Sequence, residues 1–171
     1  WYENLGTALA KYAETGDIAH TPPAYIAFIE VNKYLIARDP KNVSYRVGLA
    51  NAYLKPAYWF ESEDPVVSRQ SYELAEAAAT QALRLAPGSI EAMTAYIDAG
   101  TGLWPLLDPR TESARRDALG KQLIAQAVRR KKADPKNSYW NEDLNSIFNL
   151  LGLEAPHDGA AAARSRGPKA G

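Results

Sequence analysis

The chain of 171 residues is long enough for one compact domain or a short array of repeats, and too short for two ordinary domains joined by a linker. Its 46% apolar and 23% charged residues exclude a wholly disordered chain. Twenty Lys and Arg balance twenty Asp and Glu, which excludes an overall basic attraction for nucleic acid. There is no cysteine, which excludes a disulfide scaffold, thiolate metal sites and a cysteine nucleophile.

Apolar residues recur at helical spacing along the chain, and no stretch alternates in the manner of a strand. Leu5, Leu9 and Tyr12, for example, fall on one helix face. The pattern predicts a short helix followed by a long helix, three times over, and then one last short helix. The predicted helices span 2–14, 22–38, 43–55, 65–85, 89–101, 109–133 and 138–151.

Prolines separate the predicted helices in two recurring ways. The first kind follows a side-chain oxygen that can cap a helix, which is typical of a helix start. It occurs at Thr21-Pro22, Asp64-Pro65 and Asp108-Pro109. The second kind follows each long helical pattern, which must end there because proline lacks an N–H and clashes with the preceding turn. It occurs at Asp39-Pro40, Ala86-Pro87 and Asp134-Pro135.

The sequence divides into a helical region, residues 1–152, and a tail, residues 153–171. The tail is rich in Ala, Gly, Arg and Pro and has no apolar periodicity, so we expect it to be disordered unless a partner chain holds it. The chain opens on Trp1 inside a predicted helix, which is typical of a processed or trimmed fragment. No apolar run approaches the roughly 18 residues that a membrane span needs.

Several motifs resemble those of the tetratricopeptide repeat family. Residues 49–54, Leu-Ala-Asn-Ala-Tyr-Leu, are similar to the Leu-Gly-Asn-Ala-Tyr core of the family's first helix. Other matches are an opening similar to Trp-x-x-Leu-Gly and a second-helix pattern of small residues with a closing proline. They are carried by Tyr2, Leu5, Gly6, Ala75, Ala79, Ala82 and Pro87. The resemblance implies an all-α fold, an α-solenoid of about three helix-pair repeats with a C-terminal capping helix.

The chain departs from the family in its period and in some packing positions. The prolines that end the long helices are 47 and 48 residues apart, whereas the family's period is 34. Large residues also stand where the second helix of the family usually has small ones. These are Phe28, Asn32, Leu123 and Arg130.

The resemblance implies that the short first helices line a groove that holds a peptide or a helix of another protein. Carried over position by position, the groove-facing candidates are Thr7, Lys11, Ser44, Val47, Asn51, Leu54, Lys55, Glu91, Thr94 and Asp98. Among them Asn51 is the strongest candidate, because an amide can hydrogen-bond a peptide backbone in either sense. Lys11 and Lys55 supply part of the set of basic groups that binds a carboxylate in some members of the family, and the negative charge of Asp98 disfavours such binding.

Two segments between predicted helices are unusually apolar, and they contain Tyr58, Trp59 and Trp104. One interpretation is that these segments, 56–60 and 103–107, fold back and seal the helix corners. The other is that they form an aromatic docking surface for a partner.

A basic stretch is expected to form mainly a solvated helix face, with cations that complement the negative end of the helix dipole. Its members are Arg115, Arg116, Lys121, Arg129, Arg130, Lys131 and Lys132. It lacks the interleaved aromatic residues of a nucleic-acid site, so an acidic protein surface is the better candidate partner.

No phosphate-binding glycine loop, nucleophile elbow or metal-ligand spacing occurs, and the only histidines are His20 and His157. Gly100-Thr101-Gly102 is interpreted as a helix stop. The sequence therefore predicts a non-catalytic scaffold without cofactor or metal, which binds a protein or peptide as part of a larger assembly. The alternatives are a peptide-binding adaptor or chaperone module, and a repeat domain cut from a larger enzyme such as a transferase. The Ala, Arg, Gly and Pro content favours a bacterial origin and leaves cytoplasm and periplasm open.

Overall fold

The structure is a computed structural model that describes residues 21–154. All regular structure in this range is helical, and the range contains no strand. The elements are α2 (Thr21–Arg38), α3 (Val43–Trp59), α4 (Pro65–Leu85), α5 (Ile90–Leu103), the short 3-10 helix η1 (Trp104–Leu106), α6 (Ser113–Ala133) and α7 (Tyr139–Leu150). The all-α fold expected from the sequence is confirmed for these residues. The predicted helix 2–14 lies outside the described residues, as do residues 155–171 of the predicted tail.

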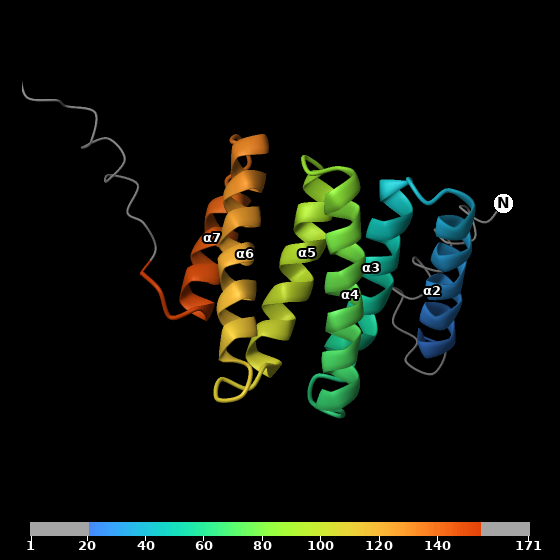
Figure 1. Ribbon diagram of the computed structural model, residues 1–171, viewed down its shortest axis with the longest axis horizontal. Helices are drawn as coiled ribbons and strands as arrows, with labels where there is room; N and C mark the ends of the chain where they lie inside the picture. The colour runs from blue at the N-terminus through green and yellow to red at the C-terminus, as the bar shows by residue number, and fades with distance from the viewer. Residues whose placement is uncertain (1–20, 155–171) are drawn as a thin grey trace, which may run out of the picture.

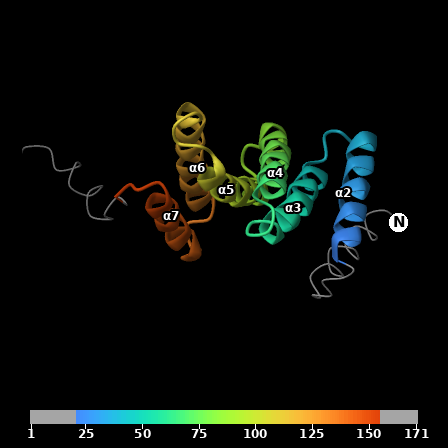
Figure 2. The ribbon, with the colours of Figure 1, turned by 90° about the horizontal axis from the view of Figure 1, so that it is seen from below.

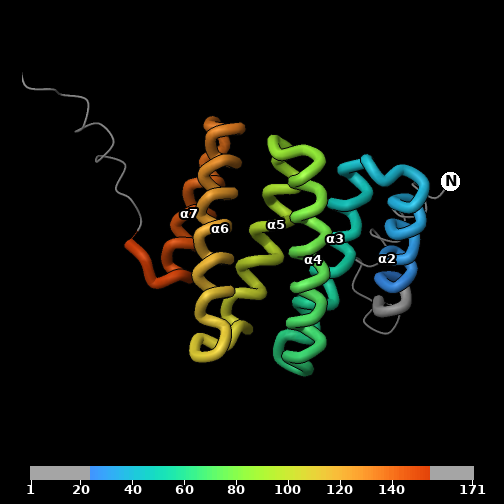
Figure 3. The backbone as a smooth tube through the Cα atoms, in the orientation of Figure 1, coloured from blue at the N-terminus to red at the C-terminus, as the bar shows by residue number. Residues whose placement is uncertain are grey.

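The helices lie side by side in chain order, from α2 at one end to α7 at the other (Figure 1). Each helix packs against the next, and α3 also contacts α5. The chain reverses direction at each connection, so that consecutive helices run antiparallel (Figure 3). Seen from below, α4 and α6 lie in one layer, and α3, α5 and α7 lie in the other (Figure 2).

Side-chain caps fix the start of three helices. Asn42, Asp64 and Ser89 each accept a hydrogen bond from a backbone N–H two or three residues later, at 3.1–3.3 Å. Pro65 occupies the first turn of α4, where its missing N–H leaves no hydrogen bond unmade. The helix start predicted at Asp64-Pro65 is therefore confirmed.

The ends of the long helices also agree with the sequence. Helices α2, α4 and α6 end at Arg38, Leu85 and Ala133, directly before the proline-containing turns. In each turn a backbone N–H closes on a carbonyl three residues earlier, as in the bond from Ser89 N to Ala86 O at 3.1 Å. The second kind of proline thus ends helices as predicted.

Helix α3 is longer than predicted, because it continues through Pro56 to Trp59. The expected end at residue 55 is wrong. A proline inside a helix removes one backbone hydrogen bond and typically costs about 3 kcal/mol. Leu54 and Ala57 on either side of it are buried in the core, and this packing offsets the loss.

The predicted helix stop at Gly100-Thr101-Gly102 is also wrong, since all three residues lie within α5. Both glycines are there for packing. A Cβ atom on Gly102 would lie 2.2 Å from the ring of Tyr72, and one on Gly100 would lie 2.7 Å from Leu123 Cδ2. Each glycine lets a large side chain of a neighbouring helix approach the backbone of α5.

Helix α6 begins at Ser113, four residues later than predicted, and the pair Asp108-Pro109 forms a turn instead. Asp108 Oδ1 accepts a hydrogen bond from Arg110 N at 2.7 Å. The side chain of Glu112 in turn accepts one from Asp108 N at 3.1 Å. These two bonds close the turn before the helix can start, which overrides the helix-start pattern.

One hydrophobic core runs through α3, α4, α5, α6 and α7. Ala75, Ala79 and Ala82 of α4 are fully buried, as the packing pattern of the second helix predicts. Larger side chains fill the space around them, among them the fully buried Tyr72 and Leu123. None of the helices described combines the length and the hydropathy needed to cross a bilayer.

Two of the four large residues at unusual positions, Asn32 and Leu123, are accommodated by glycine on a neighbouring helix. Asn32 on α2 is buried, and its Oδ1 atom lies 2.5 Å from where a Cβ of Gly48 on α3 would be. Leu123 on α6 has the same relation to Gly100 on α5. In both contacts the volume missing at the glycine is filled by the large side chain of the neighbouring helix.

Candidate partner-binding surface

One stripe of α3 faces away from the core. Ser44, Asn51, Lys55 and Tyr58 are exposed at helical spacing along it. Leu54, which the sequence placed in the groove, is only 4% exposed and belongs to the core. That prediction is wrong because Leu54 lies beside the stripe rather than on it, and its side chain packs into the core with Ala50 and Ala57.

The stripe continues onto α5, which contacts α3. Glu91 of α5 is exposed, whereas Thr94, Asp98 and Thr101 are half-buried. Most of the remaining residues of α5 are buried, so this stripe is the side of the helix that is open to solvent. The two stripes together form a surface that we call the α3–α5 face.

Asp98 lies where the α3–α5 face meets the aromatic end of α3. Burial raises the pKa of its carboxyl group, and the nearby Arg130 partly opposes that effect. Burial also raises the pKa of Tyr58 to about 12, with added repulsion from the carboxylates of Asp98 and Glu61. Among the described residues the Asp98 side chain makes no hydrogen bond or ion pair. Asp98 is therefore a half-buried acceptor beside an exposed aromatic ring.

Arg130 of α6, the neighbour of Asp98, is buried and held on three sides. It donates a hydrogen bond to Thr94 Oγ1 at 3.1 Å and forms an ion pair with Asp143 of α7. Its Cζ atom lies 4.1 Å from the ring centroid of Trp140. Arg130 thus joins α5, α6 and α7, and its charge is already committed to Asp143.

Arg130 is the residue for which the sequence interpretation failed most clearly. The basic stretch was expected to form a solvated face, yet Arg130 is only 1% exposed. Its neighbours Arg129 and Lys132 are exposed as expected. The sequence held two signals for this burial. Arg130 stands at a position where the resembled family usually has a small residue, and Asp143, on the expected polar side of the last helix, supplies the opposite charge.

The aromatic residues form two separate corners. Tyr58 and Trp59 end α3 and are 46% and 40% exposed. Tyr72 packs edge-on against Tyr58 at a centroid distance of 5.7 Å, and Tyr25 packs edge-on against Trp59 at 4.9 Å. Trp104 lies in η1 and is half-buried. The corner at Tyr58 and Trp59 is therefore not fully sealed, and the docking of a partner there stays a prediction. Lys11, the remaining predicted site residue, lies outside the described residues.

A second ionic cluster ties α4 to the start of α6. Arg69 binds Glu112 through two hydrogen bonds of 2.7 and 2.8 Å. Arg69 and Arg115 both also pair with Glu73, at 3.2 and 2.9 Å. The hydrogen bonds from Arg69 and from the backbone of Asp108, with the nearby charge of Arg115, lower the pKa of Glu112 to about 2.

We expect the folded protein to lose stability in acid because of this cluster. A carboxyl group with a lowered pKa stabilises the fold above its ordinary pKa of 4.5, and that contribution is lost as the pH falls towards about 2. Thermal melts followed by circular dichroism across this window should therefore show a falling midpoint. The Glu112→Gln variant should show a smaller fall, and equal slopes for the two proteins would contradict the role of Glu112.

A scan against models of known protein families finds no match, and a search of curated proteins finds no significant relative. Among residues 21–154, no group of three or more His, Asp or Glu side chains could hold a metal ion.

Proposed function

We propose that the chain is a non-catalytic scaffold, an α-solenoid of tetratricopeptide-like helix pairs, that binds another protein through the α3–α5 face. The helices that are described support this architecture. They are antiparallel, follow one another in space in chain order, and alternate between two layers.

The exposed stripe on α3 is the observation that carries the proposal. A helix in an array must bury one face, and α3 does so through Leu54 and its neighbours. Its outer face combines an amide, an amine and an aromatic ring in Asn51, Lys55 and Tyr58. Such a set can bind a peptide backbone, an acidic group and an apolar side chain together.

The α5 side of the face adds a different chemistry. Asp98 is an acceptor that no described side chain satisfies, and Thr94 adds a hydroxyl beside it. A partner that donates hydrogen bonds to this carboxylate would stabilise its charged form. The face therefore suits a polar segment of another protein better than a purely apolar one.

The double substitution Asn51→Ala and Lys55→Ala tests the proposal. Both residues are exposed, so the variant should keep its circular dichroism spectrum and melting midpoint. Losing the amide and the charge should weaken binding by about tenfold, since hydrogen bonds to such groups contribute about 1–2 kcal/mol. The measurement is titration calorimetry with a partner identified by cross-linking and mass spectrometry on native material.

The matched control replaces an exposed amide and an exposed cation on α4, Gln70→Ala with Arg84→Ala. It should bind like the unmodified protein. Unchanged affinity in the Asn51 and Lys55 variant would show that the α3–α5 face is not the binding surface.

A further inference from the structure

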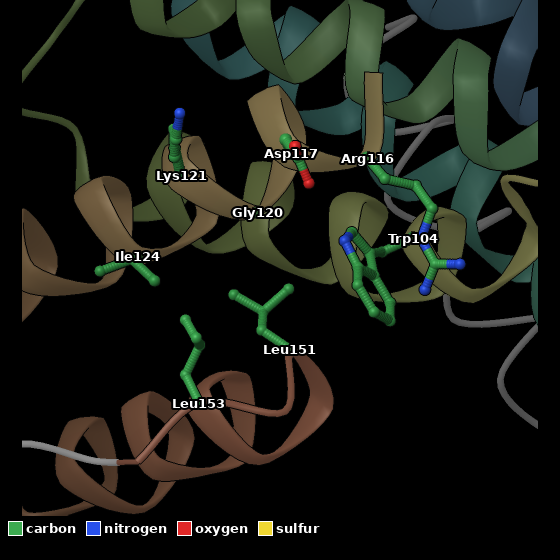
Figure 4. A pocket seen from close by; sticks show the side chains of 8 residues that line it. All are labelled: Trp104, Arg116, Asp117, Gly120, Lys121, Ile124, Leu151 and Leu153. Atoms are coloured by element: carbon green, nitrogen blue, oxygen red, sulfur yellow. The ribbon is translucent and has the colours of Figure 1, made fainter. Parts of the chain in front are cut away.

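A cavity of about 240 Å³ lies away from the α3–α5 face, between α6, η1 and the end of α7 (Figure 4). Trp104 of η1 forms one side and α6 forms another. Leu151 and Leu153, which follow α7, point towards α6 from the third side. The lining residues are Trp104, Arg116, Asp117, Gly120, Lys121, Ile124, Leu151 and Leu153.

The interior of this cavity is apolar. Ile124, Leu151 and Leu153 supply aliphatic side chains, and the buried Gly120 lets Leu151 and Trp104 approach the backbone of α6. A Cβ atom on Gly120 would lie 3.1 Å from Leu151 Cδ2 and 3.6 Å from Trp104 Nε1. Val128, four residues beyond Ile124 on the same helix face, is 48% exposed and extends the apolar surface along α6.

Hydrogen-bond donors surround the apolar interior. The guanidinium of Arg116 lies over the Trp104 ring, with its Cζ atom 3.7 Å from the centroid, and one nitrogen reaches Leu107 O at 3.4 Å. Within residues 21–154, nothing accepts a hydrogen bond from Trp104 Nε1, and Lys121 has no ion-pair partner. Asp117 is the single carboxylate of the lining. The donors exceed the acceptors, and the net charge is positive.

We propose that this cavity binds an acidic segment of another protein, which inserts one aliphatic side chain between Ile124, Leu151 and Leu153. The carboxylates that flank this side chain pair separately with Arg116 and with Lys121, whose charged ends lie apart in Figure 4, and one of them accepts a hydrogen bond from Trp104 Nε1. The volume suits one large side chain, so a single anchor residue flanked by acidic residues matches the site.

The charge around the cavity favours a partner chain over the protein's own tail. A further exposed cation, Lys132, follows Lys121 on the same side of α6 and would attract an acidic segment. Residues 155–171 contain three basic residues, Arg164, Arg166 and Lys169, against the single acidic residue Asp158. That segment has the same sign as the cavity rim, so the two repel each other.

Three synthetic peptides, capped at both ends, test the proposal. The first is Gly-Ser-Glu-Leu-Glu-Ser-Gly, the second has Lys in place of both Glu, and the third has Ser in place of Leu. Binding is read from the indole ¹H–¹⁵N signal of Trp104, one of four tryptophans, assigned with a Trp104→Phe variant. Only the first peptide should shift this signal strongly, and its affinity should fall with added salt. Equal shifts with all three peptides, or none with the first, would overturn the proposal.

Charge reversal at the rim gives a second test. Lys121 is exposed, so Lys121→Glu should fold normally and weaken the first peptide by at least about tenfold, because one attraction becomes a repulsion. Arg84→Glu, on the exposed surface of α4, is the matched control and should change little. Equal losses of affinity in both variants would show that binding depends only on the overall charge of the protein and not on the cavity. A chain ending at Glu154 that binds the peptide more than about tenfold tighter would assign the cavity to the tail instead.

Discussion

Replacing Arg130 with alanine is expected to lower the free energy of unfolding by about 3 kcal/mol. The change leaves Asp143 without its counter-charge in the junction of α5, α6 and α7, and it removes the group that lies on Trp140. Asp143 is 23% exposed, so water can solvate part of its charge. The loss therefore falls at the lower end of the range for broken buried ion pairs. Urea unfolding followed by circular dichroism measures it.

Two further variants separate the ion pair from simple loss of volume. Lys132→Ala, on an exposed part of the same helix, should change the free energy of unfolding by less than about 0.5 kcal/mol. In the background of Asp143→Asn, Arg130→Ala should cost clearly less than it does alone. Equal costs in the two backgrounds would show that the charge of Asp143 is not what Arg130 stabilises.

The substitution Ala79→Trp is expected to cost about 3 kcal/mol or more. Ala79 is fully buried on α4, inside the core shared by α3, α4 and α5, and its small size lets these helices approach each other. An indole at this position has no space, so the neighbouring helices must separate. The midpoint of urea unfolding should fall, and the transition should become less cooperative.

Ala77→Trp provides the control, because Ala77 lies on the exposed side of the same helix. It should unfold close to the midpoint of the unmodified protein. A stable and cooperative Ala79→Trp variant would mean that α4 does not pack against its neighbours as described.

Much of the helix pattern could be predicted from the sequence, because proline acts locally. A proline directly after a long apolar pattern ends the helix whatever surrounds it, and the ends at Arg38, Leu85 and Ala133 follow from that rule. The effects of Pro56 and Pro109 on the helices were predicted wrongly, because they depend on the surrounding contacts as well as on the proline itself. Burial on both sides keeps Pro56 inside α3, and the hydrogen bonds of Asp108 form a turn at Pro109.

The candidate surface could be predicted only in part. Asn51 and Lys55 are exposed as expected, since helical spacing alone puts them on one face. The prediction for Leu54 failed because aligning the chain with the family's motif does not distinguish a groove position from a core position one residue away. The cavity beside Trp104 could not be predicted, since its lining joins η1, α6 and the residues after α7 only in three dimensions.

The close fit between glycine on one helix and a bulky side chain on the next restricts how such a sequence can change over time. At Gly102, an alanine would be tolerated only after Tyr72 had become smaller, because a Cβ there would lie 2.2 Å from its ring. Substitutions at these sites should thus arise in pairs, with the reduction first and the enlargement second. Homologous chains should show correlated exchange of size across each helix contact, which would keep the spacing of the helices constant while the residues that maintain it diverge.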